Sequence, residues 1–175
     1  MSASEPLDIK NYIGLTGDTP IRFIASDVDG TLVNDAKSVD PEVVNAVRAA
    51  RESGIRVAIA SGRAWHEMDD VIDAMPCLRY FVCTNGAYVM DKEEQKELVH
   101  ISFDKTRAMD LVRKLMTYGV FVEAYVKAEI FGQYPVVGNE TAQAEHFFRP
   151  NIRPFILKTR TMVPDLLAHL ESLPE

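Results

Sequence analysis

Cysteine is scarce in this sequence of 175 residues, which contains only Cys77 and Cys83. Two cysteines are too few for a disulfide-stabilised scaffold, and their spacing does not match a CxxC metal or redox site. Because both lie in or beside apolar stretches, we expect them to be reduced residues of the core.

Long hydrophobic runs and an excess of positive charge are also absent. No apolar run approaches the roughly 20 residues that cross a bilayer, and residues 1–20 lack the basic and apolar segments of a signal peptide. We therefore expect a cytoplasmic protein without a membrane partner. The formal net charge of -7 disfavours nucleic acid as a partner. It does not disfavour a small phosphorylated ligand, because a bound metal ion can supply positive charge locally.

The composition, 47% hydrophobic and 26% charged, is that of a globular protein. The first half of the sequence also shows a regular alternation of predicted strands and helices. Short apolar segments at 21–26, 55–60 and 80–84 predict three strands, the first of them buried on both faces. Two amphipathic segments between them, which end at Gly54 and before Pro76, predict helices. This alternation is typical of an α/β fold with a parallel sheet.

Small or polar residues follow each predicted strand. The three strand ends read SDVDGT, ASGR and TNGA, and Asp27, Ser61 and Asn85 stand at these positions. In parallel α/β sheets, ligands bind beyond the carboxyl ends of the strands. Because residues two apart in a strand face the same side, we expect Asp27 and Asp29 to share one pocket.

From residue 87 the pattern changes to adjacent strands with helices between them, which predicts an α+β module. In chain order, we expect a hairpin at 87–103, a helix from Asp104 to Gly119, strands at 120–126, 128–134 and 153–159, and a last helix at 163–173. The predicted organisation is therefore a leader at 1–20, an α/β core at 21–86 and an α+β module at 87–175.

Three motifs give a resemblance to a known family. DVDGTLV at 27–33 is followed by IASGR at 59–63 and TNGA at 84–87. With this order and spacing, the chain resembles the haloacid dehalogenase-like (HAD) hydrolases, and within them the Cof-type branch, subfamily IIB, with a C2 cap. The resemblance implies a three-layer, Rossmann-like parallel sheet core, of which this chain holds the N-terminal strands. An α+β cap of the C2 type would be inserted after the third strand.

The resemblance also implies roles for residues of the motifs. Asp27 would be the nucleophile that forms an aspartyl-phosphate, and Asp29 would be the general acid and base. Both would bind Mg²⁺, Asp27 through its carboxylate and Asp29 through its backbone carbonyl. The phosphate would be held by residues of the three strand ends: Gly30, Thr31, Ser61, Gly62 and Asn85. The implied reaction is hydrolysis of small phosphorylated metabolites, with sugar phosphates as expected substrates.

Two further motifs of that family do not occur in this sequence. A lysine beyond the cap and a GDxxxD acidic pair are expected, but the one Gly-Asp pair, Gly17-Asp18, precedes the first motif. The chain therefore resembles a truncated member with an incomplete cap, and its first strand is expected at an open edge that favours self-association. Lys158 and Arg63 receive no functional role, since we expect a cap strand and a solvated helix start at these positions.

Other functions fit part of the pattern. An EF-hand calcium loop fails, because it needs glycine sixth and glutamate twelfth, whereas Gly30 is fourth from Asp27 and Ser38 is twelfth. A phosphomutase or a receiver-like phospho-acceptor domain would use the same acidic pocket. A noncatalytic or partner-completed fragment, lacking the lysine and GDxxxD motifs, is the alternative to a phosphatase.

Overall fold

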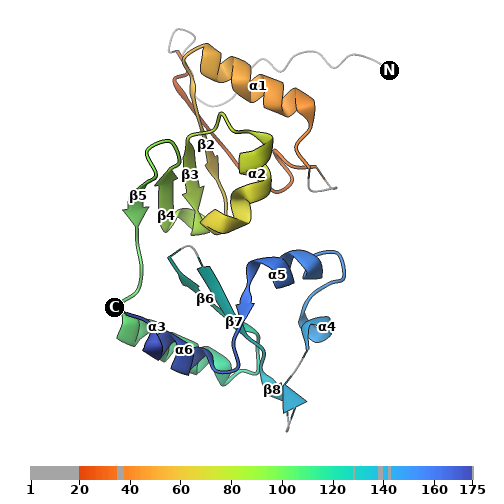
Figure 1. Ribbon diagram of the computed structural model, residues 1–175, viewed down its shortest axis with the longest axis vertical. Helices are drawn as coiled ribbons and strands as arrows, with labels where there is room; N and C mark the ends of the chain where they lie inside the picture. Colours follow the sequence, from red (N-terminus) through yellow and green to blue (C-terminus); the bar gives the residue numbers. More distant parts are fainter. Residues whose placement is uncertain (1–19, 35–37, 128, 138–139, 142, 175) are drawn as a thin grey trace.

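The computed structural model describes residues 20–34, 38–127, 129–137, 140–141 and 143–174. The predicted leader therefore lies outside the described residues, except for Pro20. The described chain forms two units, one above the other in Figure 1. The upper unit contains β1 to β5 with α1 and α2, and the lower unit contains the elements from α3 onward.

The upper unit is built on a five-stranded sheet with the spatial order β1-β2-β3-β4-β5. The first three strands are parallel, whereas β4 and β5 form an antiparallel hairpin beside β3. The bounds are β1 Phe23–Ser26, β2 Arg56–Ala60, β3 Tyr80–Cys83, β4 Tyr88–Asp91 and β5 Lys96–His100. The three predicted parallel strands and the hairpin are confirmed.

The hairpin belongs to the upper sheet, so its assignment to the second module is wrong. Phe81 of β3 pairs with Met90 of β4, and Cys83 pairs with Tyr88. All four side chains are buried, because the hairpin extends the same core. A short turn, η3 (Thr84–Gly86), reverses the chain directly after β3. We therefore propose that the second unit begins after β5 rather than at residue 87.

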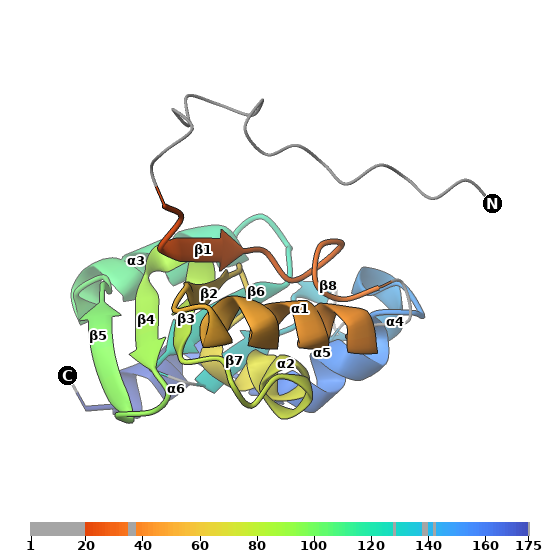
Figure 2. The same cartoon turned by 90° about the horizontal axis from the view of Figure 1, so that it is seen from above.

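The helices of the upper unit cover one face of its sheet. They are α1 (Pro41–Glu52), between β1 and β2, and η2 (Trp65–Met68) followed by α2 (Asp69–Ala74), between β2 and β3. Right-handed crossovers between neighbouring parallel strands place both connections on the same side, as Figure 2 shows. Between helices and sheet lies the main core, whose buried residues include Val47, Val57, Ile59, Met68, Val71, Met75 and Phe81.

The first strand departs from the predicted burial. Within β1, Phe23 is 54% exposed and Ile24 is 38% exposed, so the expectation of a strand buried on both faces is wrong. Among the described residues β1 pairs only with β2, and its outer edge has no neighbouring strand. Among the described residues, β1 therefore lies at the edge of the sheet, as the sequence predicts, and its apolar side chains are partly exposed there.

The lower unit is an α+β module on a three-stranded sheet with the order β10-β7-β6. Its strands β6 (Val122–Val126) and β7 (Glu129–Gln133) are antiparallel, and β10 (Thr161–Met162) is parallel to β7. Two helices, α3 (Lys105–Met116) and α6 (Leu166–Ser172), lie side by side and close a small core with this sheet. Shorter elements complete the unit: β8 Val136–Val137, β9 Glu140–Thr141 and α4 Ala144–Phe147.

The segment at 153–159 forms a helix, α5 (Arg153–Thr159), and its predicted strand conformation is wrong. Pro154 lies in the first turn of α5, where its missing N–H removes no helical hydrogen bond and its fixed φ suits the helix. The same proline would remove a donor from a strand. The strand of this region is β10, which follows at Thr161 and extends the lower sheet.

The predicted α/β class, with a Rossmann-like parallel sheet followed by an α+β module, is confirmed. The described residues provide the sheet and one helical layer of the three predicted layers. In this part of the chain, no helix combines the length and the apolar character that a membrane-spanning helix requires.

An ion pair between the buried Asp91 and the partly exposed Arg79 holds the turn between β4 and β5. Asp91 is 4% exposed, and it accepts hydrogen bonds from Arg79 Nε at 3.0 Å and Nη2 at 2.7 Å. Its Oδ1 also accepts the backbone N–H groups of Glu93 and Glu94, at 3.1 and 3.2 Å. The hydrogen bonds from Arg79 lower the pKa of Asp91 below its ordinary value of 3.8.

We expect Asp91→Asn to lower the free energy of unfolding at pH 7, and to have a smaller effect as the pH falls below 3.8. A carboxyl group with a lowered folded-state pKa stabilises the fold above its unfolded-state pKa, and this contribution is lost as the pH falls through the folded-state value. Urea unfolding at pH 7, 5 and 3 measures the effect. The control is Asp110→Asn, which removes an exposed ion pair with Arg113 and should change little. An equal loss for Asp91→Asn at all three pH values would contradict this account.

Candidate active site

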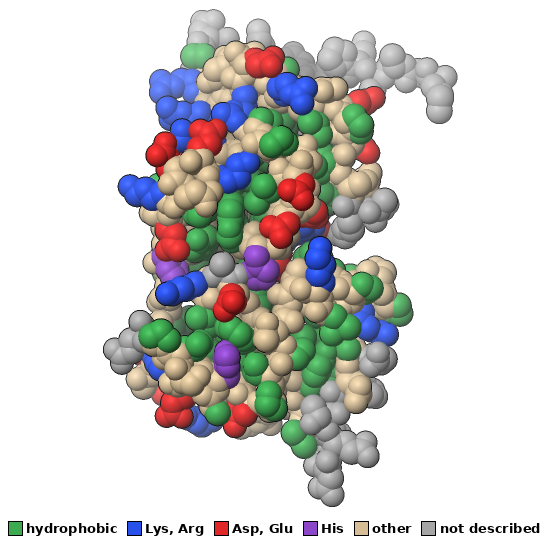
Figure 3. Space-filling view, viewed as in Figure 1, with side chains coloured by type: hydrophobic (Ala, Val, Ile, Leu, Met, Phe, Trp, Pro, Cys, Tyr) green, Lys and Arg blue, Asp and Glu red, His purple; other side chains and the backbone are tan. Residues whose placement is uncertain are grey.

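A cavity of about 580 Å³ lies between the carboxyl ends of β1 and β2 and the facing side of the lower unit. Figure 3 shows the surface indented where the two units meet. The upper unit lines the cavity with Asp27, Asp29, Ser61, Gly62, Arg63, Glu67 and Asp70, and the lower unit with Tyr125, Asn151, Ile152, Phe155, Ile156 and Arg160. Its position is the one where parallel α/β sheets bind ligands, and its size is typical of a small-molecule site.

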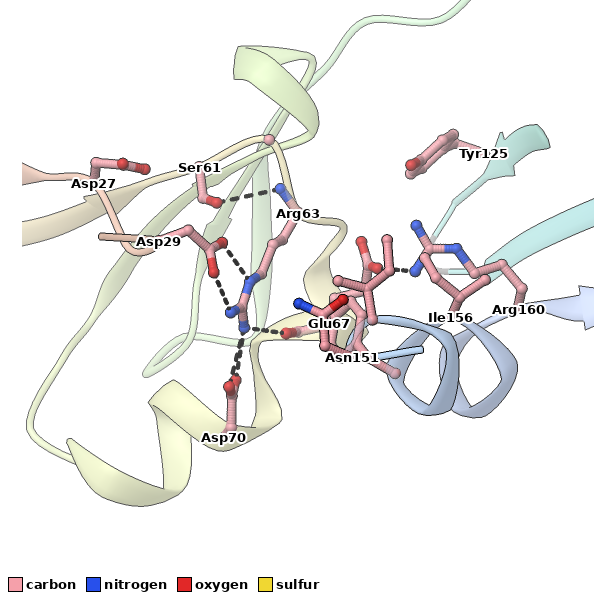
Figure 4. A pocket seen from close by; sticks show the side chains of 13 residues that line it. Asp27, Asp29, Ser61, Arg63, Glu67, Asp70, Tyr125, Asn151, Ile156 and Arg160 are labelled. Carbon is pink, nitrogen blue, oxygen red and sulfur yellow. Dashed lines mark hydrogen bonds and ion pairs between the residues drawn. The ribbon is translucent and has the colours of Figure 1, made fainter. Parts of the chain in front are cut away.

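Asp27 follows β1 directly and lies at the cavity with an exposed side chain. Val28 is fully buried in the core, so strand alternation turns Asp27 and Asp29 to the same side. Both line the cavity, and the predicted common pocket is confirmed. No side-chain hydrogen bond or ion pair from a described residue holds the Asp27 carboxylate, which lies apart from the network of the other acids in Figure 4.

The loop after Asp29 is a tight turn. The backbone N–H groups of Thr31, Leu32 and Val33 all donate to the Val28 carbonyl, at 3.0 to 3.2 Å. Gly30 has a φ of 80°, in the left-handed region that favours glycine. Gly30 and Thr31 thus shape the loop, but neither lines this cavity or the smaller one beside it. Their phosphate-binding role stays a prediction.

Ser61, Gly62 and Asn85 meet around that smaller cavity, which has about 410 Å³ and is also lined by Asp27. The Asn85 N–H donates to the Ser61 carbonyl at 3.2 Å. A Cβ on Gly62 would lie 3.1 Å from Asn85 Oδ1, so glycine permits this close approach. Ser61 Oγ accepts the N–H of Arg63 at 3.2 Å, which leaves its own proton for a ligand. The structure therefore gathers three of the five predicted phosphate-binding residues at Asp27, and their binding role stays a prediction.

Arg63 lies at the centre of the site, so the expectation of a solvated residue is wrong. Its side chain is 9% exposed, and Nε and Nη2 each donate to one oxygen of Asp29 at 2.9 Å. Nη1 donates to Asp70 at 3.0 Å and to the backbone carbonyl of Glu67 at 3.1 Å. Burial lowers the pKa of Arg63, but the hydrogen bonds to Asp29 and Asp70 outweigh it and raise this pKa. The guanidinium therefore stays charged and fixes Asp29 in place.

A second guanidinium joins the lower unit to the site. The Arg160 side chain is 8% exposed, its Nε donates to Glu123 of β6 at 2.9 Å, and its Nη1 donates to Glu67 of η2. Phe155 of α5 lies near both guanidiniums, with its ring centroid 5.4 Å from Arg63 Cζ and 5.8 Å from Arg160 Cζ. Such cation–π contacts and the bridging Arg160 connect the two sides of the cavity.

Sequence patterns alone do not identify the lower-unit residues of this site. One local signal does exist: the alternation of side chains within β6 indicates which face of that strand Glu123 and Tyr125 share. Val122 and Val126 contribute to the core under α3 and α6, so Glu123 and Tyr125 face the opposite side, toward the upper unit. For Arg160 there is no local signal, because its partner Glu67 lies 93 positions away in the chain.

The oxygen donors at Asp27 fit Mg²⁺, although the described residues contain no cluster of three or more His, Cys, Asp or Glu side chains that could hold a metal. Mg²⁺ commonly takes one or two protein carboxylates and completes its shell with waters and substrate phosphate. Asp27 offers such a carboxylate, whereas both carboxylate oxygens of Asp29 accept bonds from Arg63. Among the residues that line the cavity, four carboxylates face two guanidiniums, so a divalent cation would balance the charge.

Comparison with known proteins identifies a family and several relatives of this chain. The family of the haloacid dehalogenase-like hydrolases matches residues 24–171. The chain is 30% identical over 125 residues to the phosphatase YwpJ of Bacillus subtilis, covering 71% of this chain and 43% of YwpJ. It is 27% identical over 114 residues to the pyridoxal phosphate phosphatase YbhA of Escherichia coli, covering 65% of this chain and 42% of YbhA. The chain thus spans less than half the length of these two relatives.

A solved structure agrees with this grouping. The haloacid dehalogenase-like hydrolase from B. subtilis superposes with a TM-score of 0.68 at 23% sequence identity, covering 89% of this chain and 58% of that chain. At this identity the likeness establishes the fold, which extends over both units. The family match includes the strand ends at Asp27, Ser61 and Asn85 as well as the lower unit. The resemblance is thereby confirmed, and the chain belongs to the haloacid dehalogenase-like hydrolases.

Proposed function

We propose that this chain hydrolyses phosphate monoesters of small metabolites in an Mg²⁺-dependent reaction that passes through an aspartyl-phosphate on Asp27. The observation that carries the proposal is the Asp27 carboxylate. It lies at the carboxyl end of the first parallel strand, on the cavity, and no described side chain holds it. Family membership supports the hydrolase class, and both relatives named above are phosphatases by name.

The reaction consists of two displacements at phosphorus. One Asp27 oxygen attacks the phosphorus and forms a bond to it, while the bond to the ester oxygen breaks and Asp29 donates a proton to that oxygen. Water then attacks the aspartyl-phosphate, Asp29 accepts its proton, and the bond to Asp27 breaks. The Ser61 hydroxyl, the Gly62 N–H and the Asn85 side-chain amide are the proposed donors to the phosphoryl oxygens.

Mg²⁺ would be held by the Asp27 carboxylate and the Asp29 backbone carbonyl, with substrate oxygen and waters as its other ligands. When bound, it supplies the positive charge that lets an anionic phosphate approach the carboxylates of this cavity. Substrates are proposed as small phosphorylated metabolites, and the proposed location is the cytoplasm.

We expect Asp27→Asn to lower the release of phosphate from p-nitrophenyl phosphate by about 10³-fold or more, because an amide cannot act as the nucleophile. Phosphate is measured with Mg²⁺ and with Mg²⁺ removed by a chelator, which should also abolish turnover. The matched control is Asp69→Asn, an exposed residue of α2 that lines neither cavity, and it should keep wild-type activity. If the wild type and Asp27→Asn release phosphate at the same background rate, the noncatalytic alternative is correct.

We expect Arg63→Lys to lower kcat by about 10²-fold while KM changes little. Lysine keeps the charge but cannot donate two parallel hydrogen bonds, so the Asp29 carboxylate loses its fixed position. Steady-state kinetics with p-nitrophenyl phosphate separate the two parameters. Arg56→Lys, an exposed residue at the other end of β2, is the matched control. A rise in KM with unchanged kcat would show that Arg63 binds substrate instead of positioning Asp29.

Self-association through the outer edge of β1 is also proposed. Its basis is the edge without a neighbouring strand among the described residues, together with the 54% exposure of Phe23. Sedimentation velocity should show a dimer that dissociates on dilution, and Phe23→Lys should shift the equilibrium to monomer, because a lysine blocks edge pairing. Phe103→Lys, 61% exposed and outside the strands, should leave it unchanged. A wild-type monomer at every concentration contradicts the proposal.

A further inference from the structure

We propose that the lower-unit wall of the cavity selects phosphate esters whose leaving group is uncharged and presents an apolar or aromatic face. This inference rests on the proposed function and specifies the class of substrate that the same site accepts. The wall consists of Tyr125, Asn151, Ile152, Phe155 and Ile156, together with Arg160. Its apolar surface, its charge balance and its position opposite Asp27 carry the inference.

The wall exposes apolar surface inside a cavity. Ile152 is 39% exposed, Phe155 is 37% exposed and Tyr125 is 43% exposed, although all three line the space between the units. Apolar surface of this kind is typical of sites that bury an apolar part of a ligand. A polyol would exchange its hydrogen bonds with water for contacts with these side chains, which is unfavourable. Within the proposed class of small phosphorylated metabolites, the wall therefore disfavours the sugar phosphates that the family resemblance implies.

Neither guanidinium of the cavity has an excess positive charge to offer. Arg63 is hydrogen-bonded to the carboxylates of Asp29 and Asp70, and Arg160 is paired with Glu67 and Glu123. The group formed by Arg160, Glu67 and Glu123 therefore carries a net negative formal charge. A second anionic group on the substrate would meet this net negative charge where Arg160 lines the cavity.

The placement of the wall decides which part of the substrate meets it. Figure 4 shows Asp27, Asp29 and Ser61 on one side of the cavity, with Tyr125, Ile156 and Arg160 across from them. A phosphate at Asp27 therefore directs its leaving group toward the lower unit. Asn151, a neutral donor and acceptor on that wall, can satisfy an uncharged polar substituent.

Three esters separate charge from apolar surface: benzyl phosphate, 4-carboxybenzyl phosphate and glycerol 1-phosphate. All three release an alcohol, and the two benzyl esters differ only by a carboxylate far from the reacting bond. We expect kcat/KM for benzyl phosphate to exceed the value for each of the others by about tenfold or more, since the ring is buried on the wall and the carboxylate is repelled. Equal values, or a preference for 4-carboxybenzyl or glycerol phosphate, would overturn the inference.

Variants test the apolar surface of the wall and the negative charge at Arg160 separately. Ile152→Ser should reduce the preference for benzyl over glycerol phosphate several-fold, whereas Leu157→Ser, an exposed residue of α5 that does not line the cavity, should not. Glu123→Gln removes one of the two carboxylates at Arg160. It should raise kcat/KM for 4-carboxybenzyl phosphate relative to benzyl phosphate by about fivefold. No change with Ile152→Ser or Glu123→Gln contradicts the role of that part of the wall.

A binding measurement distinguishes failure of this inference from failure of the proposed function. The non-hydrolysable benzylphosphonate and 4-carboxybenzylphosphonate report the same preference by saturation-transfer NMR with Mg²⁺, without turnover. Binding of benzylphosphonate in preference to its carboxylated analogue, with no phosphate released from any ester, refutes the phosphatase and supports the selective wall. Hydrolysis of all three esters without preference supports the phosphatase and refutes the wall.

Discussion

The hydrogen bonds of the Arg63 guanidinium hold together the parts of this site. A nearly buried arginine needs carboxylate partners, and here they come from the loop after β1, as Asp29, and from α2, as Asp70. The same guanidinium lies over Phe155 of the lower unit. One charged group therefore fixes Asp29, the proposed general acid and base. It also bonds to α2 through Asp70 and contacts Phe155 on the opposite wall. The position of Asp29 relative to Asp27 depends on this arrangement.

The ion pairs of Arg63 and Arg160 explain how a cavity with so many acids can be stable. Each guanidinium lies between two carboxylates, which reduces repulsion among them. Asp27 is different, because no described side chain pairs with it. Its carboxylate is thus the proposed binding point for both a cation and a phosphate. In the proposed selection of substrates, the paired arginines contribute directed hydrogen bonds without surplus positive charge.

The two units contribute different physical properties to the cavity. The upper unit supplies polar strand ends, because parallel strands terminate together at one edge of the sheet. The lower unit supplies a largely apolar wall from β6, α5 and the two residues that precede α5. Arg160 bridges them by bonding to Glu67 above and Glu123 below. In the proposed function, chemistry and recognition therefore belong to different units, and both units line the cavity.

Local patterns in the sequence determined the three parallel strands, the helices between them, and the gathering of Asp27, Ser61 and Asn85 at one sheet edge. Such features depend on side-chain alternation and on turn residues, which act over a few positions. Local patterns failed for 153–159, where an apolar run suits a strand or a helix equally and a proline favoured the helix. They also placed the hairpin in the wrong unit, because pairing with β3 is not encoded within the hairpin.

The family motifs in the sequence indicated which acids carry the proposed chemistry, but only the tertiary structure decided what surrounds them. Arg63 reaches Asp29 across 34 positions of the chain, and Arg160 reaches Glu67 across 93. Neither arginine differs from a solvated one in its local sequence. Their burial, and therefore their pairing, arises when the two units come together around the cavity. The sequence by itself thus determined the reactive edge of the sheet, and the tertiary structure decided its charge balance and its opposite wall, because both depend on contacts between distant segments.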